Sequence, residues 1–430
     1  MKNDMMRVDR KKGPTINKIK RLDIPYVDRE ILPNGTELIQ VDMGTQNLVQ
    51  LEVLYRGGRI LEGKKGVSRA TSRLIKEGTF KHTSSQLAEE VDYYGANISS
   101  GANLDYSYLK IFSLGKYFDR ILPLLQEVIE DPIFPEEELA KYKASSIQKL
   151  LVENTKSELV AYKTITESLY GKNHPYGYNS TEAMYSDLSV IDMINCYKSC
   201  FGTDNRIVIL SGKLTDDIRH RVRNAFGSDS KITSKYSYQE PDERAEGTQK
   251  MVKGEDKLQS AIKIGRRLFR RDHDDFYDFF ILNTILGGYF GSRLMSTLRE
   301  EKGYTYNIYS SIDMMIHDGY FNISTEVGNE YLDNTLQGIY QEMDKLTHTK
   351  VGHKELEMVR NYLSGNFLNM VDGPFKVAGM AKVIALNSLD FDFYKNLMER
   401  IHTVSPEDLL TSAQKYFDPS KMTEIIVGNP

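Results

Sequence analysis

Two cysteines and eight histidines are the side chains of this 430-residue chain best suited to bind a metal or act as nucleophiles. Cys196 and Cys200 stand four residues apart in a helical pattern, so both thiols lie on one face. Neither a further cysteine nor a nearby histidine completes a metal site, and we expect two buried thiols. His174 lies in the loop sequence Asn173-His174-Pro175, where we expect a surface or capping histidine. The histidines are scattered, and no two of them stand four residues apart beside a carboxylate: His82, His174, His220, His273, His317, His348, His353 and His402.

An arginine and a tyrosine form a different candidate site. Arg299 and Tyr306 stand seven residues apart in the second half of the chain. A guanidinium group and a phenol both donate hydrogen bonds, which suits a peptide carbonyl or an oxyanion. A short helix that ends at Gly303, followed by a strand, would hold both side chains on rigid backbone. The simpler alternative is an exposed Arg299 paired with Glu300 or Glu301, and a tyrosine packed on a sheet.

The same order of predicted elements occurs twice along the chain. In each half, a β-type run is followed by two helices, two β-rich runs and a further helix. In the first half, the β-type run is 48–55 and the first helix is 66–76. The second helix begins at Ser84 or Ser85, either of which can cap it, and ends at Gly95. The two β-rich runs are 96–100 and 106–114, and the further helix runs through Ile121, Leu125 and Ile129. The second half has them at 258–264, 276–286, 292–301, 304–311 and 320–326, and then through Leu332, Leu336, Ile339 and Met343.

The glycines at the ends of these elements have the same spacing in both halves. Gly57 and Gly95 are 38 residues apart, and so are Gly265 and Gly303. We expect the first glycine of each pair to end a strand and the second to end a helix, because glycine accepts the positive φ of such positions. The repeated order and spacing predict a duplicated unit of helices and mostly antiparallel strands.

The length of the chain suits about two domains. We expect an N-terminal arm over 1–25, a first domain over 26–230, a linker over 231–250 and a second domain over 251–430. The region from about 227 to 254 is polar and shows no sustained hydrophobic period, which is typical of a linker.

Composition argues against several classes of function. The 56 basic and 60 acidic side chains nearly balance, so there is no bulk attraction to nucleic acid or to an anionic membrane. No apolar run approaches the ~18–20 residues of a membrane span, and the N-terminus lacks the apolar core of a secretory signal. We therefore expect a soluble, cytoplasmic protein, or a periplasmic one if a signal was removed, with neither nucleic acid nor membrane as a partner.

The first half carries a family resemblance. An L-x-N-G turn at Leu32, Asn34 and Gly35 leads to a strand that ends in glycine and then to the sequence GVSRATSRLIKEGT at 66–79. This order resembles the pitrilysin (insulinase-like, M16) zinc peptidases, in which the equivalent helix carries an H-x-x-E-H motif. The resemblance runs from Leu32 to the end of the chain. It implies an α+β fold of two homologous domains, each a mostly antiparallel sheet packed with helices, arranged like a clam.

The metal site of that family is replaced here. In the register set by the framing glycines and threonine, its two histidines become Arg69 and Arg73, and its catalytic glutamate becomes Ser72. Its third ligand falls near Gln148-Lys149. Arginine and lysine are protonated and offer no lone pair to a metal, and serine is a poor general base. The resemblance therefore implies a lost zinc site, with helix-face salt bridges as the default role of the two arginines.

The other hallmark of the family is kept. The segment LREEKGYTY at 298–306 resembles the family's LREKRGLAY stretch, and it follows a matching Gly-Gly…Ser-Arg-Leu run at 287–294. The resemblance implies that Arg299 and Tyr306 are the family's R/Y pair, which binds the substrate main chain and helps to stabilise the tetrahedral intermediate. Tyr304 is a competing choice, but Tyr306 has the family spacing.

Some bacterial members of the family divide one active site between two chains, of which one carries the zinc motif and the other the R/Y pair. The resemblance implies that this chain is the one with the R/Y pair. We expect a non-catalytic subunit of a heterodimeric zinc metallopeptidase, inactive alone and without a cofactor of its own. Zinc would lie in an H-x-x-E-H-bearing partner, and a peptide would be the substrate. The alternative is a proteolytically inactive homodimer with a structural or peptide-binding role. A third alternative is an enzyme that uses a different site.

Overall fold

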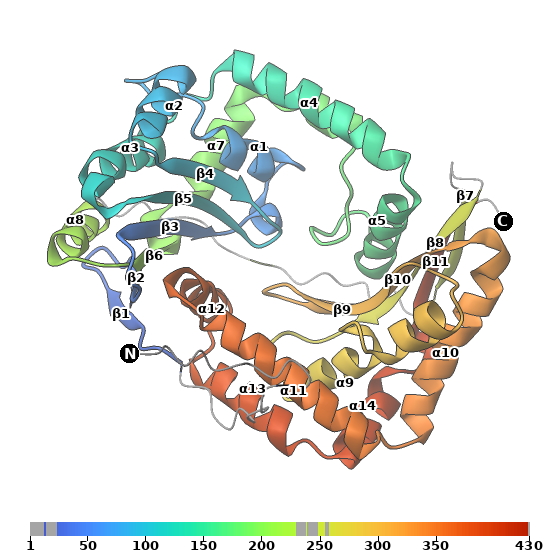
Figure 1. Cartoon of the computed structure of the whole chain (residues 1–430). Helices are drawn as coiled ribbons and strands as arrows, with labels where there is room; N and C mark the ends of the chain where they lie inside the picture. The colour runs from blue at the N-terminus through green and yellow to red at the C-terminus, as the bar shows by residue number, and fades with distance from the viewer. Residues whose placement is uncertain (1–12, 14–23, 229–237, 239–247, 254–257, 429–430) are drawn as a thin grey trace, which may run out of the picture.

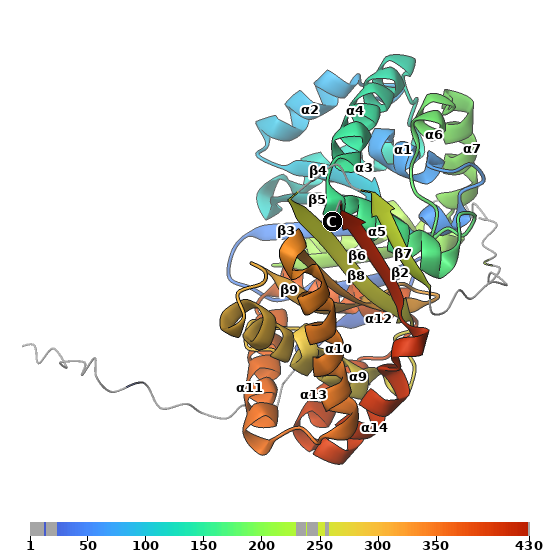
Figure 2. The same ribbon diagram turned by 90° about the vertical axis from the view of Figure 1, so that its right-hand side faces the viewer.

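The computed structural model describes residues 13, 24–228, 238, 248–253 and 258–428, which form two α+β halves (Figure 1). The expected arm over 1–25 and the expected linker over 231–250 lie almost entirely outside the described residues. Figure 2 shows the first half above the second, with α10, α11, α13 and α14 on the side of the second sheet that faces away from the first half. None of the helices in the described ranges has both the length and the apolar character that crossing a bilayer requires.

The first half is built on a six-stranded sheet with the order β1-β2-β6-β3-β5-β4. Its neighbouring strands are antiparallel except for β2 and β6, which run parallel. The strands are β1 Asp28–Ile31, β2 Glu37–Asp42, β3 Leu48–Arg56, β4 Asn97–Ala102, β5 Tyr106–Leu114 and β6 Arg206–Gly212. The helices are α1 Val67–Leu74, α2 Ser84–Tyr93, α3 Phe118–Glu130, α4 Glu136–Asn154, α5 Ser157–Tyr170, α6 Glu182–Ser186, α7 Val190–Cys200 and α8 Asp216–Gly227.

The second half repeats the plan around a five-stranded sheet with the order β7-β11-β8-β10-β9, in which only β7 and β11 run parallel. The strands are β7 Gln249–Lys253, β8 Gln259–Arg267, β9 Ile308–Met314, β10 Gly319–Gly328 and β11 Thr423–Gly428. The helices are α9 Phe276–Gly287, a π-helix Met295–Glu301, α10 Leu332–His348, α11 His353–Met370, α12 Pro374–Leu386, α13 Asp392–Thr403 and α14 Pro406–Tyr416. Short 3₁₀ turns lie at Arg59–Leu61, Gly115–Tyr117, Thr203–Asn205, Asn329–Tyr331 and Pro419–Lys421. The predicted α+β fold is confirmed.

Each half lends one helix to the sheet of the other (Figure 1). Helix α5 packs against β8 and β11, where Ala161 and Ile165 are buried with Ile425 of β11. Helix α12 packs against β2 and β6, where Ala381 is buried with Ile209 of β6. Both sheets therefore bury two faces, one under their own helices and one under a borrowed helix. The domain boundaries expected from the sequence stay a prediction. Each sheet is nevertheless covered on one face by a helix from the other expected domain.

The glycines of the repeat have two different roles. Three of them have the expected positive φ: Gly57 (121°), Gly95 (60°) and Gly303 (68°). Gly265 does not end its strand, because β8 continues to Arg267. A Cβ at Gly265 would lie 2.3 Å from the carbonyl oxygen of Phe321 and 3.2 Å from Cδ1 of Ile165 on α5. This glycine makes room for the borrowed helix.

Two local predictions were wrong in detail. Helix α2 is capped by Thr83, whose side chain accepts a hydrogen bond from the amide of Gln86, and not by Ser84 or Ser85. The strand expected over 304–311 begins only at Ile308. In both cases a threonine hydroxyl binds the backbone and forms a cap or a turn in place of regular structure.

Candidate functional site

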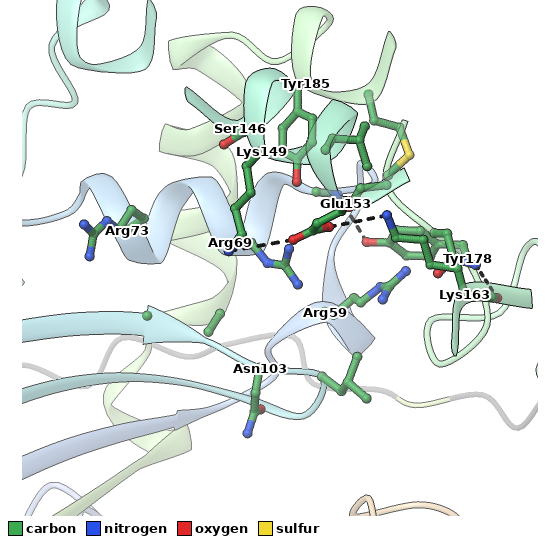
Figure 3. A pocket seen from close by; sticks show the side chains of 18 of the residues that line it. Arg59, Arg69, Arg73, Asn103, Ser146, Lys149, Glu153, Lys163, Tyr178 and Tyr185 are labelled. Carbon is green, nitrogen blue, oxygen red and sulfur yellow. Dashed lines mark hydrogen bonds and ion pairs between the residues drawn. The ribbon is translucent and has the colours of Figure 1, made fainter. Parts of the chain in front are cut away.

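A cavity of about 830 Å³ lies where the register places the lost metal site (Figure 3). Arg69 and Arg73 reach it from α1, and Lys149 reaches it from α4. Ser72 does not line the cavity, because its side chain is buried and donates a hydrogen bond to Oγ of Ser107 at 2.9 Å. The structure therefore brings together three of the four substituted positions and gives Ser72 a place in the core.

These side chains do not fit a zinc ion. Zinc binds deprotonated sulfur, imidazole nitrogen or carboxylate oxygen, whereas Arg69, Arg73 and Lys149 offer only N–H donors. Within the described ranges, no group of three or more histidine, cysteine, aspartate or glutamate side chains is placed to hold a metal. What the cavity offers is positive charge and hydrogen-bond donors.

Arg59 is a cavity residue that the sequence did not reveal. It follows the strand-ending glycines directly and lies in the 3₁₀ turn Arg59–Leu61. Its Cζ lies 3.3 Å from the centroid of the Tyr178 ring, a cation–π contact. Its Nε and Nη2 atoms are buried and have no hydrogen-bond partner in the described structure. Burial, together with the like charge of Arg69, lowers the pKa of Arg59 from 12.5 to about 10, so the group stays charged at neutral pH.

The lysines of the cavity differ from its arginines. Glu153 of α4 lies between two of them, 3.9 Å from Nζ of Lys149 and 3.3 Å from Nζ of Lys163 (Figure 3). For Arg69 and Arg73, the described residues provide neither a hydrogen bond nor an ion pair. The expected helix-face salt bridges of these arginines were therefore wrong. The acidic side chains nearby are already turned to the lysines or to the backbone.

Glu62 is the second acidic side chain of the cavity. Its Oε2 accepts a hydrogen bond from the amide of Ser68 at 3.2 Å. Burial raises the pKa of Glu62 from 4.5 to about 7, although the backbone amides and the charges of Arg59 and Arg69 oppose the shift. The carboxyl group therefore changes charge near neutral pH, whereas the cationic side chains around it keep their charge.

Glu62→Gln is expected to stabilise the protein at pH 8 but not at pH 4.5. The pKa of Glu62 is higher in the folded state, so its ionisation opposes folding above pH 7, and this cost disappears as the pH falls to 4.5. Urea unfolding should show a gain of about 1–3 kcal/mol at pH 8. Glu89→Gln, at an exposed position of α2, is the matched control and should change little at either pH. An equal gain from Glu62→Gln at both pH values would contradict the assignment.

Arg299 and Tyr306 line one hollow of about 650 Å³ in the second half. Tyr306 is 91% exposed, and Arg299 lies in the π-helix with its Cζ 4.9 Å from the ring centroid of Phe290. The ring of Tyr304 stacks on that of Tyr331 at 5.0 Å, so its phenol is less available. A π-helical turn is rare and often marks a functional position. Tyr306 is thus the tyrosine that a second molecule can reach.

The backbone at Tyr306 is a turn and not the strand expected from the sequence. The hydroxyl of Thr305 donates to the carbonyl oxygen of Glu326 at 2.8 Å, and that of Thr325 accompanies it with a bond to the carbonyl oxygen of Asn307 at 2.9 Å. These side-chain bonds replace ladder bonds before β9 starts. They fix the turn and leave the phenol of Tyr306 pointing into solvent.

Helix α5 forms a wall of both cavities. Its residue Glu158 lines the hollow of Arg299 and Tyr306, and its residues Tyr162 and Lys163 line the cationic cavity. The two candidate sites therefore border the same helix. The exchange of helices between the halves brings them together.

The remaining candidates from the sequence have structural positions. Cys196 and Cys200 are buried free thiols, as expected. His174 is only 6% exposed, so a surface position was wrong. Its Nδ1 accepts a hydrogen bond from the amide of Tyr176 at 2.9 Å, which caps the loop, and its ring stacks on Tyr170. Burial lowers the pKa of His174 to about 4, so it is neutral at physiological pH.

Similar proteins carry contrasting names. An "uncharacterized zinc protease YmxG" of Bacillus subtilis is 23% identical over 80% of this chain and 84% of its own length. A "non-peptidase homolog YmxG" of Helicobacter pylori is 22% identical over 96% of this chain and 94% of its own length. Neither level of identity assigns an activity to this chain.

Solved structures share the fold over nearly the whole length. A peptidase M16 inactive domain from Pseudomonas fluorescens matches with a TM-score of 0.85 and 22% identity, covering 94% of this chain and 98% of that one. A protease from Helicobacter pylori matches with a TM-score of 0.84 and 17% identity, covering 94% and 100%.

Two family models cover most of the chain. Residues 42–178 match the family described as insulinase (peptidase family M16), and residues 187–363 match the peptidase M16 inactive domain. The first matched region includes Arg59, Arg69, Arg73 and Lys149, and the second includes Arg299 and Tyr306. The chain therefore belongs to the insulinase-like peptidase family M16.

Proposed function

We propose that this chain is the non-catalytic subunit of a heterodimeric M16 zinc metallopeptidase. Its Arg299 and Tyr306 would bind the main chain of a peptide at a zinc site supplied by a partner with an H-x-x-E-H motif. The observation that carries the proposal is the contrast between the two halves. An exposed Arg299–Tyr306 hollow is present, whereas arginines and a lysine stand at the metal position.

The geometry of the hollow suits a partner. Tyr306 is 91% exposed, and Arg299, which lines the same hollow, has donors for a peptide carbonyl. Binding to a second chain would bury both groups, and hydrogen bonds are stronger where water is excluded. The name of the Helicobacter pylori relative, a non-peptidase homolog, is consistent with a chain that lacks activity alone.

The proposal is tested by assaying the chain alone and mixed with H-x-x-E-H-bearing M16 chains. The isolated chain should hold no stoichiometric zinc and cleave no peptide, and one mixture should cleave peptides faster than the partner alone. Size-exclusion chromatography should show a complex in that mixture. Stoichiometric zinc together with peptidase activity in the isolated chain would refute the proposal. The cytoplasmic location expected from the sequence stays a prediction.

A second function is a homodimeric pseudoenzyme with a structural or peptide-binding role. The presence of a roomy cationic cavity at the metal position favours it, because such a cavity can bind without catalysing. A homodimer that binds peptides and gains no activity from any M16 partner would support this function over the first.

A further inference from the structure

We propose that the cavity at the lost metal position is a binding site for an oxyanion, either a carboxylate or a phosphate group. The site would be centred on Arg59 and Arg69. It shares no lining residue with the hollow of Arg299 and Tyr306 and does not depend on their role. It thus goes beyond the proposed function.

The cavity carries an excess of positive charge. Five cationic side chains line it, against two acidic ones, Glu62 and Glu153. Glu153 already pairs with Lys149 and Lys163, and Glu62 accepts a hydrogen bond from the backbone. Among the described residues, neither carboxylate forms an ion pair with an arginine of the cavity, although Glu62 attracts Arg59 and Arg69 electrostatically. A bound anion would neutralise the positive charge that remains.

Arg59 and Arg69 line the cavity from different elements, and Figure 3 shows the guanidinium group of Arg59 turned toward Tyr178, while Arg73 lies farther along the helix that carries Arg69. Two like charges in one cavity repel each other, and the repulsion is relieved when an anion lies between them. Burial and the charge of Arg69 lower the pKa of Arg59, and the charge of Glu62 opposes this shift. Arg59 and Arg69 therefore offer two cationic groups to an anion in this cavity.

The donor edge of Arg59 matches an oxyanion. The Nε and Nη2 atoms of an arginine form a two-pronged edge that binds both oxygens of a carboxylate or two oxygens of a phosphate. This chain uses that edge elsewhere: Nε and Nη2 of Arg223 bind the carboxylate of Glu30, and those of Arg293 bind the carboxylate of Glu355 at 2.8 and 3.0 Å. At Arg59 the same two atoms have no acceptor in the described structure. Because both atoms are buried, a small rotation of the side chain accompanies binding.

The size and lining of the cavity also suit a ligand of this class. A volume of about 830 Å³ holds an amino-acid side chain with flanking peptide, or a phosphorylated small molecule. Ser145, Ser146 and Asn103 add neutral polar groups, and Tyr178 and Tyr185 add aromatic surface. The cavity is open enough for exchange, since Arg69 is an exposed residue.

The test is calorimetric titration of the full chain with three probes. The first is inorganic phosphate, the second a blocked peptide rich in glutamate, and the third the same peptide with glutamine in place of glutamate. We expect phosphate, the acidic peptide or both to bind, and the glutamine peptide to bind at least about tenfold more weakly than the acidic one. Binding of phosphate alone identifies a phosphate site, and binding of the acidic peptide alone identifies a side-chain carboxylate site.

Variants assign the binding to the cavity. Arg69→Gln is exposed and should fold, and it should weaken oxyanion binding about tenfold. The matched control is Arg120→Gln, a 65% exposed arginine on α3 outside the cavity, which should bind as the parent does. Tyr306→Phe should also leave binding unchanged, so failure of the proposed peptidase role and failure of the oxyanion site are distinguishable. No binding of either anion, or equal affinity in Arg69→Gln and the parent, would overturn the proposal.

Discussion

Tyr306→Phe is expected to lower the kcat of the mixed peptidase by about 100-fold or more, because it removes one hydrogen-bond donor from the transition state. The variant keeps the ring and loses only the hydroxyl group. Since Tyr306 is 91% exposed, the substitution should not change the stability of this chain. Steady-state kinetics of the complex, together with size-exclusion chromatography, would separate a catalytic loss from a lost interface.

Tyr304→Phe is the matched control, since it removes the same atom two residues away. Tyr304 lines the same hollow, but its ring stacks on Tyr331 and it lacks the family spacing to Arg299, so kcat should stay near the parent value. Arg299→Ala should raise KM and lower kcat/KM, because the guanidinium group would bind the peptide main chain before and during the reaction. If Tyr306→Phe and Arg299→Ala both leave the activity of the mixture unchanged, this chain does not contribute an R/Y pair.

Asp318→Ala is expected to destabilise the chain by about 3–5 kcal/mol, because it removes the carboxylate that neutralises the buried charge of Arg267. The side chains of Arg267 and Asp318 are only 10% and 9% exposed, and Nε of Arg267 donates to Oδ2 of Asp318 at 2.9 Å. The Arg267 guanidinium also lies over the ring of Tyr170, whose hydroxyl donates to the carbonyl oxygen of Gly319 at 3.2 Å. The pair therefore stands where α5 docks on the second sheet. Denaturant unfolding followed by circular dichroism measures the loss.

Asp372→Ala provides the comparison. Asp372 is 78% exposed and pairs with Lys376 at 3.7 Å, so its loss should cost less than about 1 kcal/mol. The double variant Arg267→Met with Asp318→Ala should recover part of the stability that the single variant loses, because it removes the buried positive charge as well. An Asp318→Ala variant as stable as Asp372→Ala would show that the pair contributes little.

The repeat of elements and of glycines was enough to predict a duplicated unit of helices and mostly antiparallel strands, and the family resemblance implied the α+β fold. Hydrophobic periods mark each helix and strand locally, and the family register brought Arg69, Arg73 and Lys149 to one position, where the structure places them around one cavity. The elements are visible in sequence because they depend on neighbours within one turn or one strand, whereas the shared position of the three cationic residues came from the family resemblance. The R/Y assignment of Arg299 and Tyr306 stays a prediction that kinetics must test.

Other features depend on contacts between distant segments, which no local pattern contains. Arg59 contributes to the cavity from a three-residue turn, and its only signal is its place after Gly57-Gly58. His174 sits in a loop sequence typical of a surface, yet it is buried against Tyr170 of α5. The turn at Tyr306 depends on hydroxyl bonds to β10, some twenty residues away. Tertiary contacts overrode the local preference in each case.

The reciprocal packing of α5 and α12 has a mechanical consequence. A hinge between the two halves would have to pull α5 from β8 and β11 and α12 from β2 and β6, which would expose apolar surface in two places at once. The two halves should therefore move as one rigid body and unfold in a single step. An opening that admits a large peptide must then form at the interface with another molecule and not between the two halves of this chain.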